Sequence, residues 1–191
     1  MLQFTRLREL NASGNRHITT CTPFANTLER LNISYNKSGM TDDGSHVCTN
    51  LKKLTICDTT RRIALRNPLA QTLKILNIND NERIGDDDIR LCTNLKELHI
   101  RNTNYITTCT PFAHTLEKLV MHDSHMTNDG MKLCTKLREL HGSGKHAILC
   151  TSFTNTIKIL NSDAIPDDNV KLCKNLKIYL SRIIGIGESV T

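Results

Sequence analysis

Histidine, cysteine and paired acidic residues are the side chains in this 191-residue sequence that could carry catalysis or metal binding. His99, His122 and His141 recur at intervals of about twenty residues, and an imidazole serves either as a general acid–base group or as a metal ligand. No Cys-x-x-Cys pair accompanies them, and no nucleophile, base and orienting group stand together, so zinc binding and enzymatic chemistry are disfavoured. What these residues can do depends on the elements that position them.

The pattern L-x-x-L-x-(apolar) recurs along almost the whole chain and defines those elements. Its three apolar residues alternate as in a short strand with one buried face, and the side chains between them point outward. The pattern predicts an α/β leucine-rich repeat solenoid, a curved horseshoe with parallel strands on its concave face and short helices or 3-10 turns on its convex face. We expect one domain over residues 4–180, with residues 181–191 as a C-terminal cap or tail. The nine units start at Leu7, Leu28, Leu51, Leu73, Leu95, Leu116, Leu137, Ile157 and Leu176.

Two kinds of connector alternate between the strands. The first reads I-T-T-C-T-P-F-A-x-T over residues 18–27 and 106–115, and its proline favours an extended entry followed by a single 3-10 turn. The second carries an acidic pair, such as Asp42/Asp43 or Asp167/Asp168, before a short apolar stretch that ends in cysteine. Because acidic side chains stabilise the cap and first turn of a helix, this pattern predicts short helices and not calcium sites.

An asparagine follows the apolar pattern in several units. Asn15, Asn36 and Asn81 each come three residues after the third apolar position. We expect their amides to turn inward and to hydrogen-bond buried backbone groups of the next coil, forming a structural ladder. The ladder should weaken elsewhere, where the same place is taken by Thr59, Thr103, Ser124 and Lys145.

Seven of the eight cysteines keep a fixed place in the repeat, either three or seven residues before a motif leucine. Such places suit a small, buried, mildly apolar side chain. Equivalent places two units apart are separated by about 10 Å, which is beyond the reach of a disulfide. The sequence therefore predicts free thiols, a reducing intracellular compartment and no secretion. Cys57 is the exception, because it takes an outward strand position.

The stretch from Leu91 to Leu119, LCTNLKELHI … ITTCTPFAHTLEKL, resembles cysteine-containing leucine-rich repeat proteins. It is especially similar to the leucine-rich repeat proteins of large DNA viruses of amoebae, such as the Marseillevirus group. This resemblance implies a viral protein that acts in the cytoplasm or nucleus of a host cell. Related repeats occur in eukaryotic F-box proteins, but no F-box-like segment precedes the first unit, which disfavours a ubiquitin-ligase adaptor.

The charge and composition narrow the classes of partner. The net charge of +6 is mild, and aromatic residues make up only 4%, so a dedicated nucleic-acid binder is disfavoured. No apolar run is long enough for a signal peptide or a membrane span. A row of basic residues could be a solvated edge of the sheet or could attract an acidic protein partner. Its members are Arg8, Lys52, Lys74, Lys96, Arg138, Lys158 and Lys177.

Varied polar side chains on an otherwise uniform frame favour a non-enzymatic module that binds a protein partner on its concave face. No cofactor or metal is expected, and a structural or virion-associated subunit is the alternative. The first strand, predicted over residues 4–12, has little chain before it to cover its edge, which predicts self-association through the N-terminal unit. The candidate partner-binding residues are Tyr35, Asn77, Asn79, His99, Arg101, His122 and His141.

Overall fold

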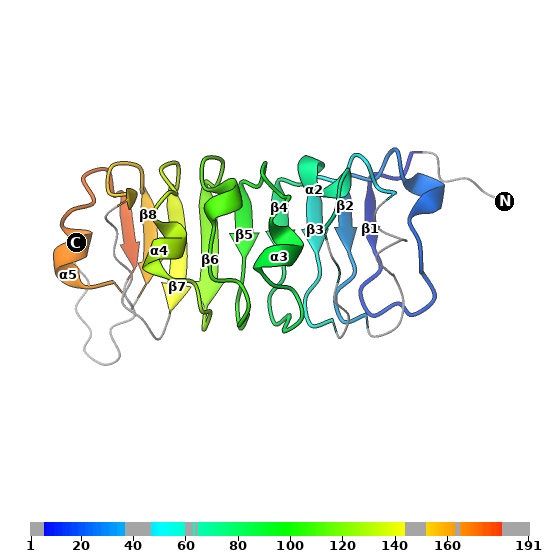
Figure 1. Ribbon diagram of the computed structural model, residues 1–191, viewed down its shortest axis with the longest axis horizontal. Coiled ribbons are helices and arrows are strands. Elements are labelled where there is room, and N and C mark those ends of the chain that lie inside the picture. The colour runs from blue at the N-terminus through cyan, green and yellow to red at the C-terminus, as the bar shows by residue number, and fades with distance from the viewer. Residues whose placement is uncertain are drawn as a thin grey trace.

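The computed structural model describes residues 6–36, 47–59, 63, 65–143, 152–162 and 165–180. Within them, nine parallel strands pair in sequence order to form a single sheet, and the helices and 3-10 turns cover one side of it (Figure 1). The predicted solenoid of short parallel strands and short convex elements is thereby confirmed. The strands are β1 (Glu9–Asn11), β2 (Arg30–Asn32), β3 (Lys53–Thr55), β4 (Ile75–Asn77), β5 (Glu97–His99), β6 (Lys118–His122), β7 (Glu139–Ser143), β8 (Ile159–Ser162) and β9 (Ile178–Leu180).

One leucine from each of the strands β2 to β8 forms a continuous inner column. Leu31 pairs with Leu54, Leu54 with Leu76, and the in-register column runs on to Leu160 in β8. These leucines are buried, whereas the residues on either side of them are exposed or half-buried. This follows from the two-residue period of a strand, which sends alternate side chains to opposite faces of the sheet.

Where the structure describes them, the connectors form short convex elements of the predicted kinds, with one exception. The Thr-Pro-Phe connectors form the 3-10 turns η1 (Thr22–Phe24) and η2 (Thr110–Phe112). The acidic connectors form the helices α3 (Asp86–Ile89), α4 (Asn128–Met131) and α5 (Asp167–Val170). In the third unit Pro68 precedes a helix, α2 (Leu69–Thr72), and not the 3-10 turn that its proline predicted. The backbone N–H of Ala70 reaches the carbonyl of Arg66 there, which closes an α-helical ring.

In α3 and α4 acidic residues lie in the first turn, and the cap itself is another residue. In α3 the cap is Gly85, whose N–H donates to Asp88 Oδ2 at 2.9 Å. In α4 Thr127 is the cap, and its hydroxyl accepts from the N–H of Gly130 at 2.9 Å. The pair Asp42/Asp43 lies outside the described residues.

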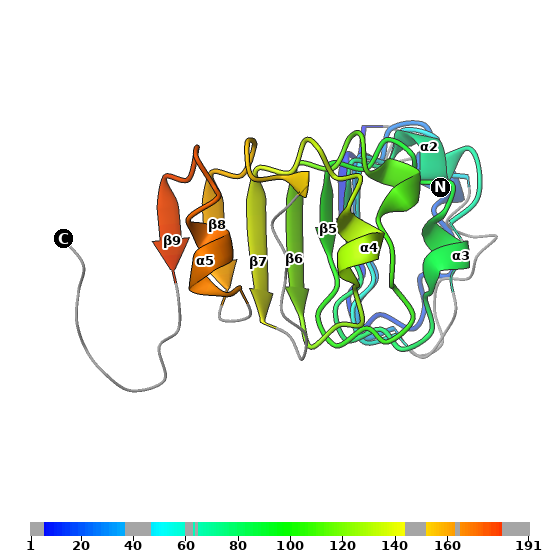
Figure 2. The same ribbon diagram turned by 60° about the vertical axis from the view of Figure 1, so that its left-hand side comes forward.

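The two ends of the sheet differ from its centre. Glu9 and Asn11 in β1 are exposed, and all three residues of β9 are exposed. Strand β1 covers residues 9–11 and is shorter than the strand expected over residues 4–12. The expected C-terminal cap over residues 181–191 lies outside the described residues. Figure 2 shows β9 as the last strand at its end of the array. No helix among the described residues is long and apolar enough to cross a membrane.

Candidate binding face

The face of the sheet opposite the helices carries the outward side chains, and we call it the open face. At its centre, Glu97 and His99 on β5, Lys118 on β6, and Glu139 and His141 on β7 form a cluster that we call the His–Glu patch. The register places His99 beside Val120, and Val120 beside His141, so the two histidines flank β6. The structure therefore places His99 and His141 on one face, on either side of Val120.

Each histidine of the His–Glu patch contacts the carboxylate two residues before it. His99 Nε2 lies 2.6 Å from Glu97 Oε1, and His141 Nε2 lies 2.6 Å from Glu139 Oε1. Between the two pairs, Lys118 Nζ is 2.9 Å from Glu139 Oε1 and 3.8 Å from Glu97 Oε1. Partial burial raises the pKa of the Glu139 carboxyl, but hydrogen bonds from Lys118 and His141 outweigh it and leave that pKa below its usual value.

Glu97 and Glu139 each lie against the histidine of their own strand. The ammonium group of Lys118 occupies the space between the two carboxylates. Among the described residues, no group of three or more His, Cys, Asp or Glu side chains is arranged to hold a metal ion. The patch is thus a polar network that fixes its own side chains on the open face.

A hollow of about 350 Å³ lies beside the His–Glu patch, toward the carboxyl ends of the strands. Arg101 and His122 line it together with Ser143, whose backbone N–H donates to His122 Nδ1 at 3.1 Å. The Ser143 hydroxyl lies 2.9 Å from the same nitrogen. Because a backbone N–H can only donate, His122 Nδ1 is the acceptor of this hydrogen bond. This hydroxyl–imidazole pair therefore orients His122 over the hollow.

The two asparagine candidates hold the backbone at the ends of the central strands. Asn77 Oδ1 accepts from the N–H of Asn79 at 3.1 Å and from the Cys57 thiol at 3.2 Å. Asn79 Oδ1 accepts from the N–H of Arg101 at 2.8 Å, which fixes the base of that side chain. Tyr35 is 60% exposed and follows β2 with a φ of 56°, so the structure places it away from β5–β7.

The ladder residues differ in depth. Asn81 is fully buried, and its Nδ2 donates to Ile56 O at 3.1 Å and to Thr59 Oγ1 at 2.9 Å. Its Oδ1 accepts from the N–H groups of Arg83 and Ile84. The amide therefore reaches the preceding coil, whereas the next coil was expected. Asn36 is buried and Asn15 is half-buried, with Asn15 Oδ1 accepting from the N–H groups of His17 and Ile18. Lys145 lies outside the described residues.

The basic row at the start of the strands is interrupted by acids. The two units that lack a basic residue there carry Glu29 and Glu117. Lys52 Nζ lies 2.9 Å from Glu29, and Lys96 Nζ lies 3.0 Å from Glu117. The hydrogen bond from each lysine lowers the pKa of the carboxyl that accepts it. The row is therefore mainly basic, with two acidic residues that pair with their neighbours.

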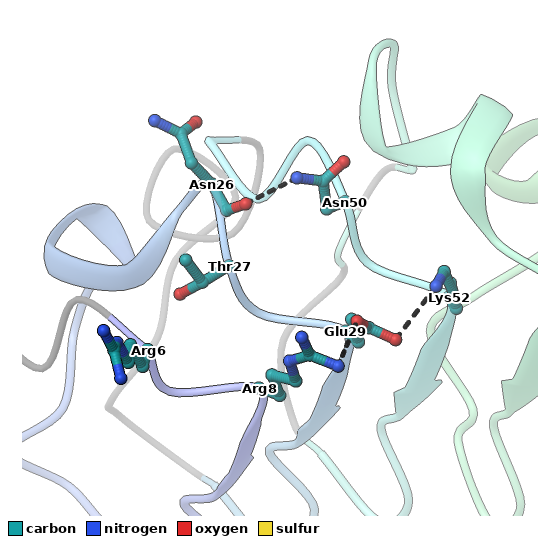
Figure 3. Close-up of a pocket in the computed structure, with 7 residues that line it drawn as sticks. All are labelled: Arg6, Arg8, Asn26, Thr27, Glu29, Asn50 and Lys52. Atoms are coloured by element: carbon teal, nitrogen blue, oxygen red, sulfur yellow. Dashed lines mark hydrogen bonds and ion pairs between the residues drawn. The ribbon is translucent and has the colours of Figure 1, made fainter.

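The N-terminal end of this row borders a hollow of about 610 Å³ (Figure 3). Glu29 lies between Arg8 and Lys52 there, and its oxygens are 3.7 Å from Arg8 and 2.9 Å from Lys52. The single carboxylate is shared between two cations, which weakens the positive field of the hollow. Its lining consists of Arg6, Arg8, Asn26, Thr27, Glu29, Asn50 and Lys52.

The described cysteines are free thiols, and four of them lie in two pairs of neighbours. The neighbouring Cys48 thiol and burial raise the pKa of Cys21, and the neighbouring Cys134 thiol and burial raise the pKa of Cys109. These pairs join the two different connectors of successive coils, whereas cysteines at equivalent places of the repeat lie two units apart. Burial alone raises the pKa of Cys92 to about 12. Cys57 is half-buried at an outward position.

Comparison with models of known protein families and with curated proteins finds no match for this sequence.

Proposed function

We propose that this protein is a non-enzymatic module that binds a protein partner on its open face, with Arg101 and the His–Glu patch at the centre of contact. The observation that carries the proposal is the fixed arrangement of polar side chains over β5–β7. His99 and His141 are held by Glu97 and Glu139 at 2.6 Å, so these side chains lose little conformational freedom when a partner binds. A rigid surface of this kind favours recognition.

Arg101 is the best candidate anchor within this face. Its guanidinium makes no ion pair with any described residue, whereas its backbone is fixed by Asn79. Arginine is among the residues enriched at the energetic centres of protein interfaces, because it combines charge with planar hydrogen-bonding geometry. The adjoining hollow of about 350 Å³ offers space for an acidic or amide side chain of the partner.

The free thiols support an intracellular setting for that partner, because disulfides form readily in oxidising compartments. Cys109 and Cys134, for example, are both buried and free. We further propose a partner from the host cell, as the resemblance of the stretch from Leu91 to Leu119 to leucine-rich repeat proteins of amoebal viruses would imply.

A capture experiment tests this proposal with two matched charge reversals. Arg101→Glu alters the open face, and Lys132→Glu alters the opposite side, where Lys132 follows α4 and forms an exposed ion pair with Asp129. Both variants change the net charge equally. We expect Arg101→Glu to weaken capture of the partner about thirtyfold, as loss of an interface anchor does, and Lys132→Glu to leave it unchanged. Equal binding by Arg101→Glu and the parent protein would contradict the proposal.

A further inference from the structure

The last strand of the sheet has an apolar edge. Within the described residues β9 pairs with β8 alone, and the strand order places it at one end of the sheet (Figure 2). Its three residues, Ile178, Tyr179 and Leu180, are 46%, 36% and 54% exposed. None of them carries a charge. Charged side chains commonly protect the edge of a sheet against pairing with another chain, and β9 itself lacks this protection.

The opposite end of the sheet carries that protection. Glu9 in β1 forms an ion pair with Arg30 at 2.9 Å, and the exposed Arg8 precedes the strand. A second chain that paired with this edge would have to pack against these charges. Self-association was expected through the N-terminal unit, because little chain precedes it. The distribution of charge favours the C-terminal end instead.

We propose that two copies of this chain associate by antiparallel pairing of their β9 strands, about a two-fold axis beside Tyr179. The N–H of Ile178 donates to Lys158 O, next to β8, at 3.1 Å. Because the backbone groups of successive strand residues point to opposite edges, the N–H and C=O of Tyr179 point away from β8. No described residue forms a hydrogen bond with either group. In the pair, the two copies of Tyr179 exchange N–H···O=C hydrogen bonds.

Centring the pair on Tyr179 aligns the whole of β9 with the whole of its copy. Ile178 then lies opposite Leu180 of the second copy, twice by symmetry, and the two Tyr179 side chains lie side by side. Aliphatic and aromatic cross-strand pairs of this kind stabilise antiparallel sheets. Ile178 and Leu180 belong to the open face, because they are in register with Ile159 and Asn161 of β8. The contact is therefore apolar on both faces of the sheet.

The same register keeps the nearest positive charges apart. Lys177 directly precedes β9, and the two copies of this residue lie about 13 Å apart along the paired strands. This separation exceeds the screening length of about 8–10 Å at physiological salt. A pairing shifted toward the start of the strand would bring the two lysines opposite each other. Charge therefore favours the register that aligns β9 in full.

The pair joins two open faces in one continuous sheet. Each copy presents its own Arg101 and His–Glu patch, so a partner with two binding sites is held more tightly than by one copy. This consequence rests on the proposed function, whereas the pairing of β9 does not. Because the contact is small, we expect weak association in the absence of a partner.

Sedimentation of the full chain from micromolar to millimolar concentration tests the pairing, and we expect a monomer–dimer equilibrium. Tyr179→Pro should abolish the dimer, because proline removes the N–H that bonds the second copy and spares the hydrogen bonds between β9 and β8. Leu180→Lys should weaken dimerisation about tenfold or more, since it places a charge among the apolar pairs. Leu133→Lys is the matched control and should dimerise as the parent does, because Leu133 is exposed just after α4 on the helical side.

Amide hydrogen exchange identifies the strand that pairs. Exchange at the Tyr179 N–H should slow as the concentration of the parent protein rises, and exchange at the Glu9 N–H in β1 should not. Circular dichroism of each variant checks that it is folded. Leu180→Lys and the exchange measurement test the pairing independently of Tyr179→Pro.

A parent protein that stays monomeric over the whole range would overturn the proposal, and so would equal dimerisation of the parent and Leu180→Lys proteins. Slowed exchange at Glu9 in place of Tyr179 would show association through β1 and would overturn it as well. Growth beyond a dimer would do the same, because it indicates head-to-tail stacking and not a closed two-fold pair. Since these measurements use no partner, their outcome is independent of the capture experiment.

Discussion

Asp86 at the start of α3 binds Thr107 in the following coil. Asp86 Oδ1 accepts from the N–H of Thr107 at 3.0 Å, and Asp86 Oδ2 accepts from the Thr107 hydroxyl at 2.6 Å. The same carboxylate lies 3.4 Å from the N–H of Thr108. One side chain therefore joins two coils on the convex side, and the backbone N–H of Asp86 adds a hydrogen bond to Tyr105 O at 3.0 Å.

The three consecutive aspartates of α3 should differ in their contribution to stability. Asp86 joins two coils, Asp88 accepts from the cap N–H of Gly85, and Asp87 is exposed. We expect Asp86→Ala and Asp88→Ala each to lower the free energy of unfolding by about 1–3 kcal/mol, because backbone donors lose their acceptor. Asp87→Ala should stay within about 0.5 kcal/mol of the parent. Urea unfolding checks this, and equal losses in all three variants would rule out the role of Asp86.

Asn81 should be the most costly ladder residue to remove. Its buried amide makes four hydrogen bonds, two of them to the preceding coil. Asn81→Ala should therefore lower the free energy of unfolding by about 1–3 kcal/mol or more, since several buried groups lose their partner. Asn104→Ala is the control, because Asn104 is exposed. Asn79→Ala should fall between them, since Asn79 accepts from the N–H of Arg101. Urea midpoints that are indistinguishable for Asn81→Ala and Asn104→Ala would contradict this.

Gly130 in α4 lies close to the backbone of the preceding coil. A Cβ atom there would lie 2.9 Å from Thr108 Cα and would overlap the Thr107 carbonyl. Because backbone cannot move aside as a flexible side chain does, Gly130→Ala should separate the coils and destabilise the protein by about 1–3 kcal/mol. Gly85→Ala meets Tyr105 at 3.2–3.3 Å and should cost less. Thermal unfolding of the two variants measures the difference, and a smaller loss for Gly130→Ala would refute it.

The His–Glu patch should make stability depend on pH in the acid range. The pKa of Glu139 is lower in the folded protein than in the unfolded chain, so the unfolded chain binds more protons between those two values. The contribution of Glu139 is therefore complete above the unfolded carboxyl pKa of about 4.3, and it is lost as the pH falls through the folded pKa. Glu139→Gln should be less stable than the parent at pH 6, and this difference should shrink toward pH 3.

Urea unfolding at both pH values measures this, and added salt should reduce the difference because the pair is partly exposed. Glu82→Gln is the control, since Glu82 is exposed and lies outside the patch. A difference between Glu139→Gln and the parent that is the same at pH 3 and pH 6 would contradict the assignment.

The strands and their faces could be predicted because their signal is local and repeated. Leu28 and Leu31 are spaced for one strand, and nine phased copies leave sequential parallel pairing as the arrangement that buries every copy. The pair Glu97/His99 could also have been found, because residues two apart on a strand share a face. The same spacing recurs in Glu139/His141, and it was the overlooked signal.

Contacts between connectors could not be read from the repeat. The Asp86–Thr107 and Cys109–Cys134 contacts join connectors of different type. Their existence depends on how loops of unequal length stack, and a one-residue shift along either loop would break them. Cysteines at equivalent places of the repeat lie two coils apart. The cysteine that neighbours Cys21 or Cys109 lies in the adjacent coil, at a different place in the repeat, so the repeat pattern does not reveal it.

Photo-crosslinking from the open face tests the proposed function most directly. A photoreactive side chain introduced at Arg101 lies over β5–β7, and one introduced at Lys132 lies on the helical side of the same sheet. In lysate, the protein with the probe at Arg101 should form a discrete covalent adduct with one partner protein, and the protein with the probe at Lys132 should not. An adduct from Lys132 alone, or the same adducts from both positions, would contradict recognition through the open face.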